Sequence, residues 1–425
     1  MPPAPNSKDN MRSIPSIAYD RTNLRVLSIA IATVMIGFGL FGPFLPLYAE
    51  LLGANIGLQI GVIVASFTLT RALCSIPVGW LSDRIGRKNV ISLGVFLYAV
   101  VTLILAFSGD WIQLLILRGV QGVTSAFIWT PATTIIADST PPERRGRALS
   151  IFNSSATTGL ILGPALGGAI QIWTKNYFGL QLLDSFRSPF LFGAVLASVS
   201  SLIVWLYARE THLGTTPARP GEGVSAKLNP KFRATFYTLM TLAFANGFTL
   251  GFTPPLIVYF AEHEYGLSVE STAISISVAF FLSGAVNAMV QLIGGRLADS
   301  TRKKKTIMIL SILVSQLVTV LLPMSPTVFL FVSLFIIRSG LLALLRPSLF
   351  VFQEDLMPKN IRGKLTGVMD TMRSAGAVSG PILGFLFYDL ISPSTPFYLG
   401  AGIFLVATLF FYVYAREPKL EESEA

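Results

Sequence analysis

Twelve long apolar stretches restrict what this 425-residue chain can fold into more than any other feature of its sequence. Each has about 17 to 25 mostly apolar residues, the length with which an α-helix crosses the hydrocarbon core of a bilayer. The chain is 52% hydrophobic and 13% charged, with a mean hydropathy of +0.65, so it has too few polar side chains to cover a soluble protein. We therefore predict an all-α integral membrane protein and exclude a soluble enzyme. The twelve predicted spans are residues 24–48, 58–81, 89–108, 111–137, 149–172, 188–208, 235–260, 271–295, 306–324, 327–353, 365–388 and 397–415.

The distribution of Lys and Arg predicts the orientation, because these residues resist translocation and gather on the cytoplasmic side. Of the 32 basic residues, 25 fall at the two ends of the chain and in the even-numbered connections, whereas only Lys175 and Arg187 fall in the odd-numbered ones. We expect a multi-pass protein of the plasma membrane with both termini in the cytoplasm. Most of the net charge of +10 follows from this orientation and does not indicate binding of nucleic acid.

Five arginines and one aspartate lie inside the predicted spans, where a lipid-facing charge costs ~2.5–3.5 kcal/mol. They must therefore face protein or a water-filled cavity. Asp370 and Arg373 are three residues apart on one helical face, and Arg71 lies at a depth within reach of them. We hypothesise that these three form a coupling cluster that rearranges during transport; the alternative is a static structural pair. The other three buried charges are Arg118, Arg338 and Arg346.

The chain repeats itself at an offset of about 217 residues. Asp138 and Arg145 correspond in this way to Asp355 and Arg362, and the sequence YARE occurs at Tyr207 and again near the C-terminus. Two parallel halves of six spans are predicted from this repeat. The expected divisions are an N-terminal tail 1–23, a first six-helix bundle 24–208, a linker 209–234, a second bundle 235–415 and a C-terminal tail 416–425.

Three motifs give the chain a family resemblance. They are GWLSDRIGRK at 79–88, LILRGVQG at 115–122 and GLILGPALGG at 159–168. In this order they resemble the signature loop, the span-four motif and the span-five antiporter motif of the major facilitator superfamily. The resemblance covers nearly the whole chain and is closest to the drug/proton antiporter branch. It implies the major facilitator fold and transport by alternating access.

The resemblance assigns a conformational role to the loop between spans two and three. It implies that Asp83 meets the start of span eleven and stabilises an outward-open state, with Arg87 and Lys88 in a charge relay. The alternative is a solvated basic turn that only sets orientation. Asp299 marks a second copy of the loop. We expect this copy to set the orientation in the membrane more than to take part in conformational change. The remaining members of the first loop are Gly79, Arg84 and Gly86.

The span-five motif combines small residues with a helix breaker. Gly159, Gly163 and Gly167 recur every four residues and permit close helix packing, while Pro164 removes a backbone donor. This pattern is typical of a hinge or a tight seam, and its likeness to exporters favours antiport. The alternative is a purely structural seam, since span eleven repeats the spacing.

Arg118, in span four, has two open interpretations. It can lower the pKa of a neighbouring acid or bind an anionic substrate, and the resemblance implies proton coupling. The alternative is structural pairing with backbone carbonyls. Spans one and seven lack a buried acid, because Glu50 and Glu262 lie only at their outer ends. In this the chain departs from exporters that hold a proton-carrying acid in span one.

Candidate cavity residues are aromatic, amide or basic side chains on spans that contain helix breakers. For any single aromatic, packing against lipid or core is the alternative. The set is Phe38, Phe41, Gln121, Trp129, Asn246, Phe252, Tyr259, Asn287, Gln291, Arg338 and Arg346.

We expect neither a metal nor a cofactor, because Cys74 is the one cysteine and His212 and His263 fall in connections with no partner at metal spacing. The sequence predicts a transporter that is not an enzyme and that works as a monomer in the lipid bilayer. It most resembles one that exports amphipathic small molecules against proton entry. Carriage of an anionic metabolite by the buried arginines, and a non-transporting sensor or scaffold, are the alternatives.

Overall fold

Nearly all described residues of the chain are helical. The computed structural model describes residues 21–141, 144–211, 230–300, 304–356 and 362–415, apart from some side chains near the gaps. Within these ranges no strand occurs. The first half contains α1 Arg21–Phe41, α2 Leu45–Leu51, α3 Gly57–Ile85, α4 Arg87–Leu105, α5 Trp111–Asp138, α6 Arg145–Phe178 and α7 Leu182–Tyr207. The second contains α8 Pro230–Tyr265, α9 Val269–Ser300, α10 Lys304–Leu321, α11 Val328–Leu356, α12 Arg362–Leu390 and α13 Thr395–Tyr414.

The predicted first span, residues 24–48, is divided into two α-helices. A short 3-10 segment, Gly42–Phe44, separates α1 from α2, and Pro43 and Pro46 lie at the start of the segments that follow each break. Proline has no backbone N–H to donate, so it ends one helix and begins the next without breaking the chain's path.

Ten helical segments of the described chain are long and apolar enough to cross a membrane, with α1 and α2 taken as one. The two remaining long helices, α6 and α12, carry the glycine motifs and more polar side chains, which lowers their hydropathy. The fold is therefore that of an all-α membrane protein, while the count of twelve spans stays a prediction. Several helices extend past the predicted spans: α8 begins at Pro230, where a linker was expected to continue to 234.

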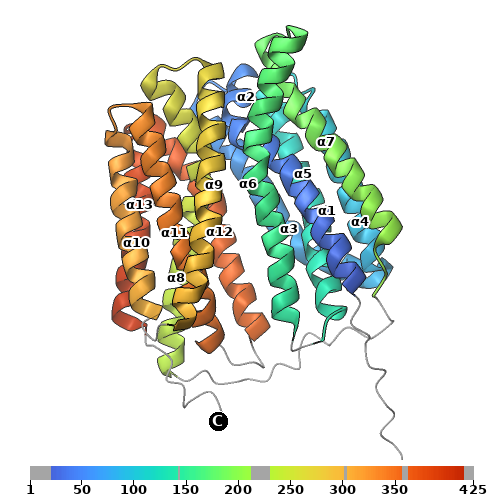
Figure 1. Cartoon of the computed structure of the whole chain (residues 1–425), viewed down its shortest axis with the longest axis vertical. Helices are drawn as coiled ribbons and strands as arrows, with labels where there is room; N and C mark the ends of the chain where they lie inside the picture. Colours follow the sequence, from blue (N-terminus) through green and yellow to red (C-terminus); the bar gives the residue numbers. More distant parts are fainter. Residues whose placement is uncertain (1–20, 142–143, 212–229, 301–303, 357–361, 416–425) are drawn as a thin grey trace, which may run out of the picture.

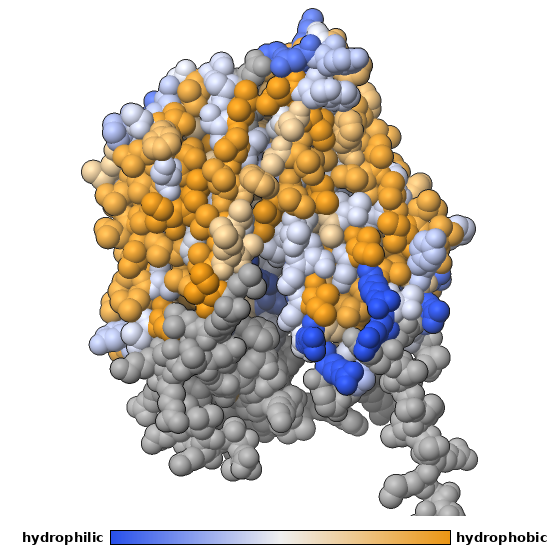
Figure 2. Space-filling view, in the orientation of Figure 1, coloured by the Kyte–Doolittle hydropathy of each residue, from blue (hydrophilic) through white to orange (hydrophobic). Residues whose placement is uncertain are grey.

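The two halves stand side by side as separate helix bundles (Figure 1). The start of α1 and the end of α13 lie at the same end of the molecule, at the bottom of the view; we call this the termini end and the opposite one the far end. Apolar side chains cover the flanks of the molecule in Figure 2 and strongly polar ones gather toward its ends. This distribution is the one that a bilayer requires of a spanning protein.

Candidate functional site

The apolar cores show that the halves meet at the far end. One cluster of buried side chains includes Phe44, Tyr48 and Phe190 of the first half together with Phe260 and Phe385 of the second. Toward the termini end, two larger clusters lie each within one half, and a smaller one of Val78, Val90 and Ala126 lies within the first. The molecule is therefore closed at the far end, and among the residues that the structure describes its halves share no core at the termini end.

A polar junction between α2 and α8 accompanies the shared core. The Nε2 atom of His263 lies 3.3 Å from Oε1 of Glu50. A carboxylate oxygen of Glu50, one of Glu262 and a ring nitrogen of His263 all lie within 4.8 Å of one another. The His263 ring also stacks on Tyr259, with centroids 4.1 Å apart. The expectation that His263 falls in a connection with no partner at metal spacing is thus wrong, because α8 continues past it and brings its exposed ring against Glu50 of the first half. His212 lies outside the described residues.

Arg118 is buried inside the first half and has a defined set of partners. Only 3% of its surface is exposed, and it donates a 2.6 Å hydrogen bond to Oε1 of Gln121. Gln121 in turn donates to Thr102 at 2.9 Å. The guanidinium also lies over the rings of Phe38 and Phe67, at 5.6 and 4.8 Å from their centroids. The contacts of Arg118 in the described structure are therefore an amide and two aromatic rings, and its buried Nε atom has no hydrogen-bond partner there.

Arg338 occupies in the second half the place that Gln121 has in the first. It is 4% exposed and donates a 2.7 Å hydrogen bond to Thr319. At the repeat offset of 217, Arg338 corresponds to Gln121 and Thr319 to Thr102, so the same helix pair is joined in each half by a different donor. Arg338 and Gln121 were predicted to line the cavity; both are instead buried between helices of one half in this conformation.

The predicted coupling residues come together between α3 and α12. Arg373 donates a 2.8 Å hydrogen bond to Asp370, and both side chains are more than half exposed. Arg71, on α3, lies within electrostatic range of both, and Arg346 lies within range of Arg373. Arg71 is also placed over the indole ring of Trp129, 5.0 Å from its centroid. Four charged groups from both halves therefore share this space.

The signature loop is held within the first half. Arg87 donates to Asp83 at 3.1 Å and also pairs with Asp138 of α5. Gly86, at φ +95°, makes the turn between α3 and α4 in a conformation that favours glycine. The carboxylate of Glu210 accepts from the first two backbone N–H groups of α4, at 3.2 and 3.0 Å. Arg84 is exposed, Lys88 and Gly79 are half-buried, and the side chain of Asp299 lies outside the described part of the chain.

The remaining cavity candidates divide by burial. Phe41, Phe252 and Tyr259 were expected to line a cavity, but they are 1%, 2% and 5% exposed and belong to the shared core. They were selected as aromatics next to helix breakers, and the same breakers allow the close packing that buries them. Five candidates are half-buried and Arg346 is exposed; the five are Phe38, Trp129, Asn246, Asn287 and Gln291.

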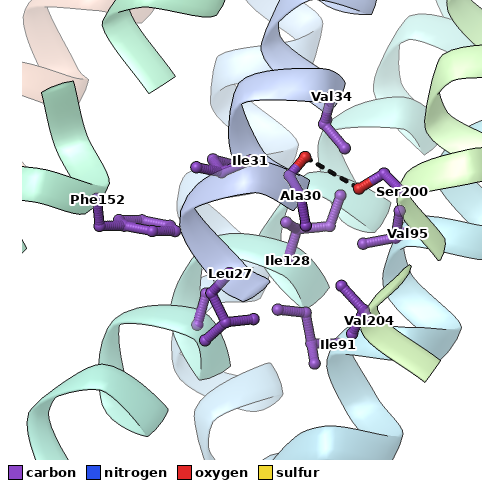
Figure 3. Close-up of a pocket in the computed structure, with 11 residues that line it drawn as sticks. Leu27, Ala30, Ile31, Val34, Ile91, Val95, Ile128, Phe152, Ser200 and Val204 are labelled. Carbon is purple, nitrogen blue, oxygen red and sulfur yellow. Dashed lines mark hydrogen bonds between the residues drawn. The ribbon is translucent and has the colours of Figure 1, made fainter. Parts of the chain in front are cut away.

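Two hollows differ in what they can hold. The one in Figure 3 has a volume of about 10 Å³, is lined by side chains such as Leu27 and Val34 of the first core, and is crossed by a 2.9 Å hydrogen bond from Ser200 to the Ala30 carbonyl. It is too small for a substrate. An apolar hollow of about 760 Å³ lies between α8, α12 and α13 and includes Phe244 and Met372. Its volume is in the range of drug-sized ligands.

Comparison with known proteins decides the family. The sequence profile described as Major Facilitator Superfamily matches residues 27–376 and 239–425. The chain belongs to the Major Facilitator Superfamily. Its members are transporters and not enzymes, so the protein is embedded in a membrane, binds a small-molecule substrate and needs no cofactor as a rule.

Several named proteins are similar to this chain over almost its whole length. Multidrug resistance protein 2 of Bacillus subtilis (strain 168) is 26% identical, over 95% of this chain and 98% of its own. Quinolone resistance protein NorA of Staphylococcus aureus (strain COL) is 24% identical, over 90% and 94%. A solved structure of a bacterial homologue of the human lysosomal transporter Spinster, inward-facing and occupied, has a TM-score of 0.75 at 17% identity, covering 96% of this chain and 99% of that one. At this identity, the similarity to the solved structure shows a shared fold alone.

The glycine motif of this superfamily member forms a helix seam. A Cβ atom on Gly159, Gly163 or Gly167 would overlap backbone atoms of α1, so no larger residue fits there. In the second half, Gly376 and Gly380 meet α8 backbone in the same way. The seam is thus symmetric, while Pro164 is buried within α6. Its role in gating stays a prediction.

Proposed function

We propose that this transporter exports amphipathic small molecules across the plasma membrane in exchange for protons, by alternating access and as a monomer. The observation that carries the proposal is the contrast between a single core spanning both halves at the far end and two separate cores at the termini end. If the termini end faces the cytoplasm, as the basic residues indicate, this arrangement is the one that loads substrate from inside the cell.

The side chains available to substrate support an amphipathic and not a strongly anionic cargo. Trp129 and Phe38 contribute half-buried aromatic surface, and Asn287 and Gln291 contribute amides joined to each other by a hydrogen bond. Arg118 and Arg338 are buried between helices of a single half, so two of the five arginines are not offered to an anion. The names of the relatives, which refer to multidrug and quinolone resistance, support the same class.

The coupling role falls to the charged cluster between the halves. Asp370 is the acid there, opposed by Arg373 on its own helix and Arg71 on α3. Because the cluster joins elements of both halves, a change in the charge of Asp370 alters how the halves attract one another. That is the property required of a group that couples proton movement to alternation.

Transport by purified protein in proteoliposomes tests the proposal. We expect a cationic amphipathic dye to move when a pH gradient is imposed and to stop when an ionophore collapses that gradient. Movement of phosphate or carboxylate compounds in place of the dye would replace the proposal by anion transport. An absence of flux for both classes, in protein that remains monodisperse, would favour a sensor or scaffold.

The orientation has its own test. In a Cys74→Ser background, single cysteines at Asn55 and Asn89 occupy exposed positions at the far end and the termini end. We expect a membrane-impermeant maleimide added to intact cells to label the first and not the second. The reverse pattern would place the termini outside and overturn the assigned direction.

A further inference from the structure

Asp389 joins the two halves at the far end. It lies in the last turn of α12, where its Oδ1 atom accepts from the backbone N–H of Gly57 at 3.1 Å and its Oδ2 atom from that of Leu58 at 3.0 Å. These are the first two residues of α3. Their N–H groups have no acceptor inside the helix and lie at the positive end of the helix dipole. A carboxylate of the second half therefore caps a helix of the first.

At the far end the two helices approach each other closely. A Cβ atom added to Gly57 would lie 2.8 Å from Oδ1 of Asp389, and one added to Gly61 would lie 2.5 Å from the Pro381 carbonyl oxygen. Nearer the termini end, a Cβ on Gly79 of α3 would meet only Thr130 of its own half. The two helices are thus in close contact at the far end, where Asp389 acts.

The same two helices offer a second contact of the same kind. They run antiparallel, and α3 has its own carboxylate, Asp83, near its C-terminal end. Gly57 to Asp83 spans ~39 Å and Arg362 to Asp389 spans ~40 Å at 1.5 Å per residue. Asp83 therefore stands level with the first turn of α12, which is the partner that the family resemblance implies for it. In this structure it is paired with Arg87 instead.

We propose that Asp389 is a positioning residue that latches the far end shut, as the reciprocal partner of Asp83 at the termini end. In each latch a carboxylate near the C-terminus of one helix caps the N-terminus of the other. With the far end closed, Asp389 caps α3 and Asp83 pairs with Arg87. With the termini end closed, the Asp389 cap is broken and Asp83 makes the contact with α12 that the family resemblance implies. The inference rests on the proposed function only in that the two ends open alternately.

Distances between spin labels on the full-length protein test the latch without any substrate. In a Cys74→Ser background, labels at Gly109 and Phe329 report the far end, and labels at Ser150 and Gly367 report the termini end; all four positions are exposed. Asp389→Ala removes the cap, and Asp389→Asn keeps one acceptor oxygen and the side-chain shape. Asp184→Asn is the matched control, because this acid pairs at 2.7 Å with Arg187 of its own half.

We expect Asp389→Ala to raise the ratio of far-end-open to far-end-closed molecules about tenfold, the scale of a charge-assisted contact at a helix terminus. Asp389→Asn should raise it by a smaller factor, and Asp184→Asn should leave it unchanged. Asp83→Asn should shift it in the opposite direction. Equal populations in Asp389→Ala and Asp184→Asn would overturn the latch.

Failure of the latch is distinguishable from failure of the proposed function. A population shift in Asp389→Ala, in protein that moves no dye in proteoliposomes, supports the latch and contradicts the drug/proton assignment. Gradient-driven dye transport by the wild type, with no population shift in Asp389→Ala, supports the drug/proton assignment and contradicts the latch. Dye transport together with the shift supports both.

Discussion

The two ends of the bundle are held in different ways. At the far end the contacts cross from half to half: the shared aromatic core, the Glu50–His263 junction and the cap that Asp389 places on α3. At the termini end the described contacts stay within a half, as when Arg87 joins Asp83 to Asp138, or when Lys305 donates to the carbonyl oxygens at the end of α13. Contacts of the first kind select a conformation, whereas those of the second kind keep each half rigid.

The largest effect is expected from separating the halves at the far end. In Gly61→Leu the new side chain would overlap the Pro381 carbonyl, so α3 and α12 could not close. We expect gradient-driven transport to fall about 100-fold, because alternation requires this contact. Spin-label distances should show a far end that stays open.

Gly146→Ala is the control for that variant, since a Cβ at this position meets nothing within 4 Å. Its transport should remain within about twofold of wild type. Normal transport in monodisperse Gly61→Leu would show that far-end closure does not depend on the α3–α12 contact.

The charged cluster provides the next test of what connects the halves. Asp370→Asn keeps the shape of the side chain and removes the charge that pairs with Arg373. If Asp370 carries the proton, transport driven by a pH gradient should fall at least about tenfold while substrate exchange without a gradient continues. Unchanged driven transport would identify the Asp370–Arg373 contact as a static pair.

A pH effect of intermediate size is expected from the far-end junction. Two carboxylates, Glu50 and Glu262, approach from opposite halves beside His263, so protons remove their repulsion and lower pH should favour far-end closure. Across the titration we expect the open-to-closed ratio in wild type to change about tenfold, or ~1.4 kcal/mol. Spin-label distances at several pH values measure this ratio.

Replacing both acids, as in Glu50→Gln with Glu262→Gln, should remove most of that pH dependence and leave the far end closed throughout. The neighbouring acids Asp389 and Glu264 remain in the variant, as do Tyr259 and Tyr388 of the same junction. A pH dependence as large as in wild type would assign the effect to those groups.

The smallest effect should come from a contact within one half. Glu210→Gln weakens the cap on the first turn of α4 and should lower stability by about 1 kcal/mol. The midpoint of thermal unfolding in detergent should fall by a few degrees in Glu210→Gln. The control is Glu264→Gln, which changes an exposed acid at the far end. A change in the open-to-closed ratio would contradict the view that contacts within one half do not select the conformation.

Much of the architecture could be predicted because it depends on local chemistry. The apolar lengths locate the helices, the repeat divides the chain into two halves, and the spacing of Gly159 and Gly163 correctly indicates close helix packing. Proximity of Asp370 and Arg373 follows from their spacing on one helix. These features involve neighbours in the sequence, or the match of a segment to the bilayer.

Contacts between the halves could not be predicted in the same way. Asp389 and Gly57 are 332 residues apart, and nothing in the local sequence around either indicates the other. His263 appeared to be a loop residue because the apolar stretch ends before it, whereas the helix does not. Phe252 appeared to line a cavity, and only packing against the residues around Gly400 shows it to be core.

The sequence by itself determined that this protein spans a membrane as a two-fold repeat of helices, because hydrophobic length and backbone satisfaction in lipid permit few other solutions. Only the tertiary structure decided which end is closed and which side chains close it. The physical reason is that each half has its own core, so the energy that distinguishes one conformation from the other lies in a few contacts between halves. Those contacts, including the cap of Asp389 on α3, depend on how the two bundles are oriented and not on the local sequence of either.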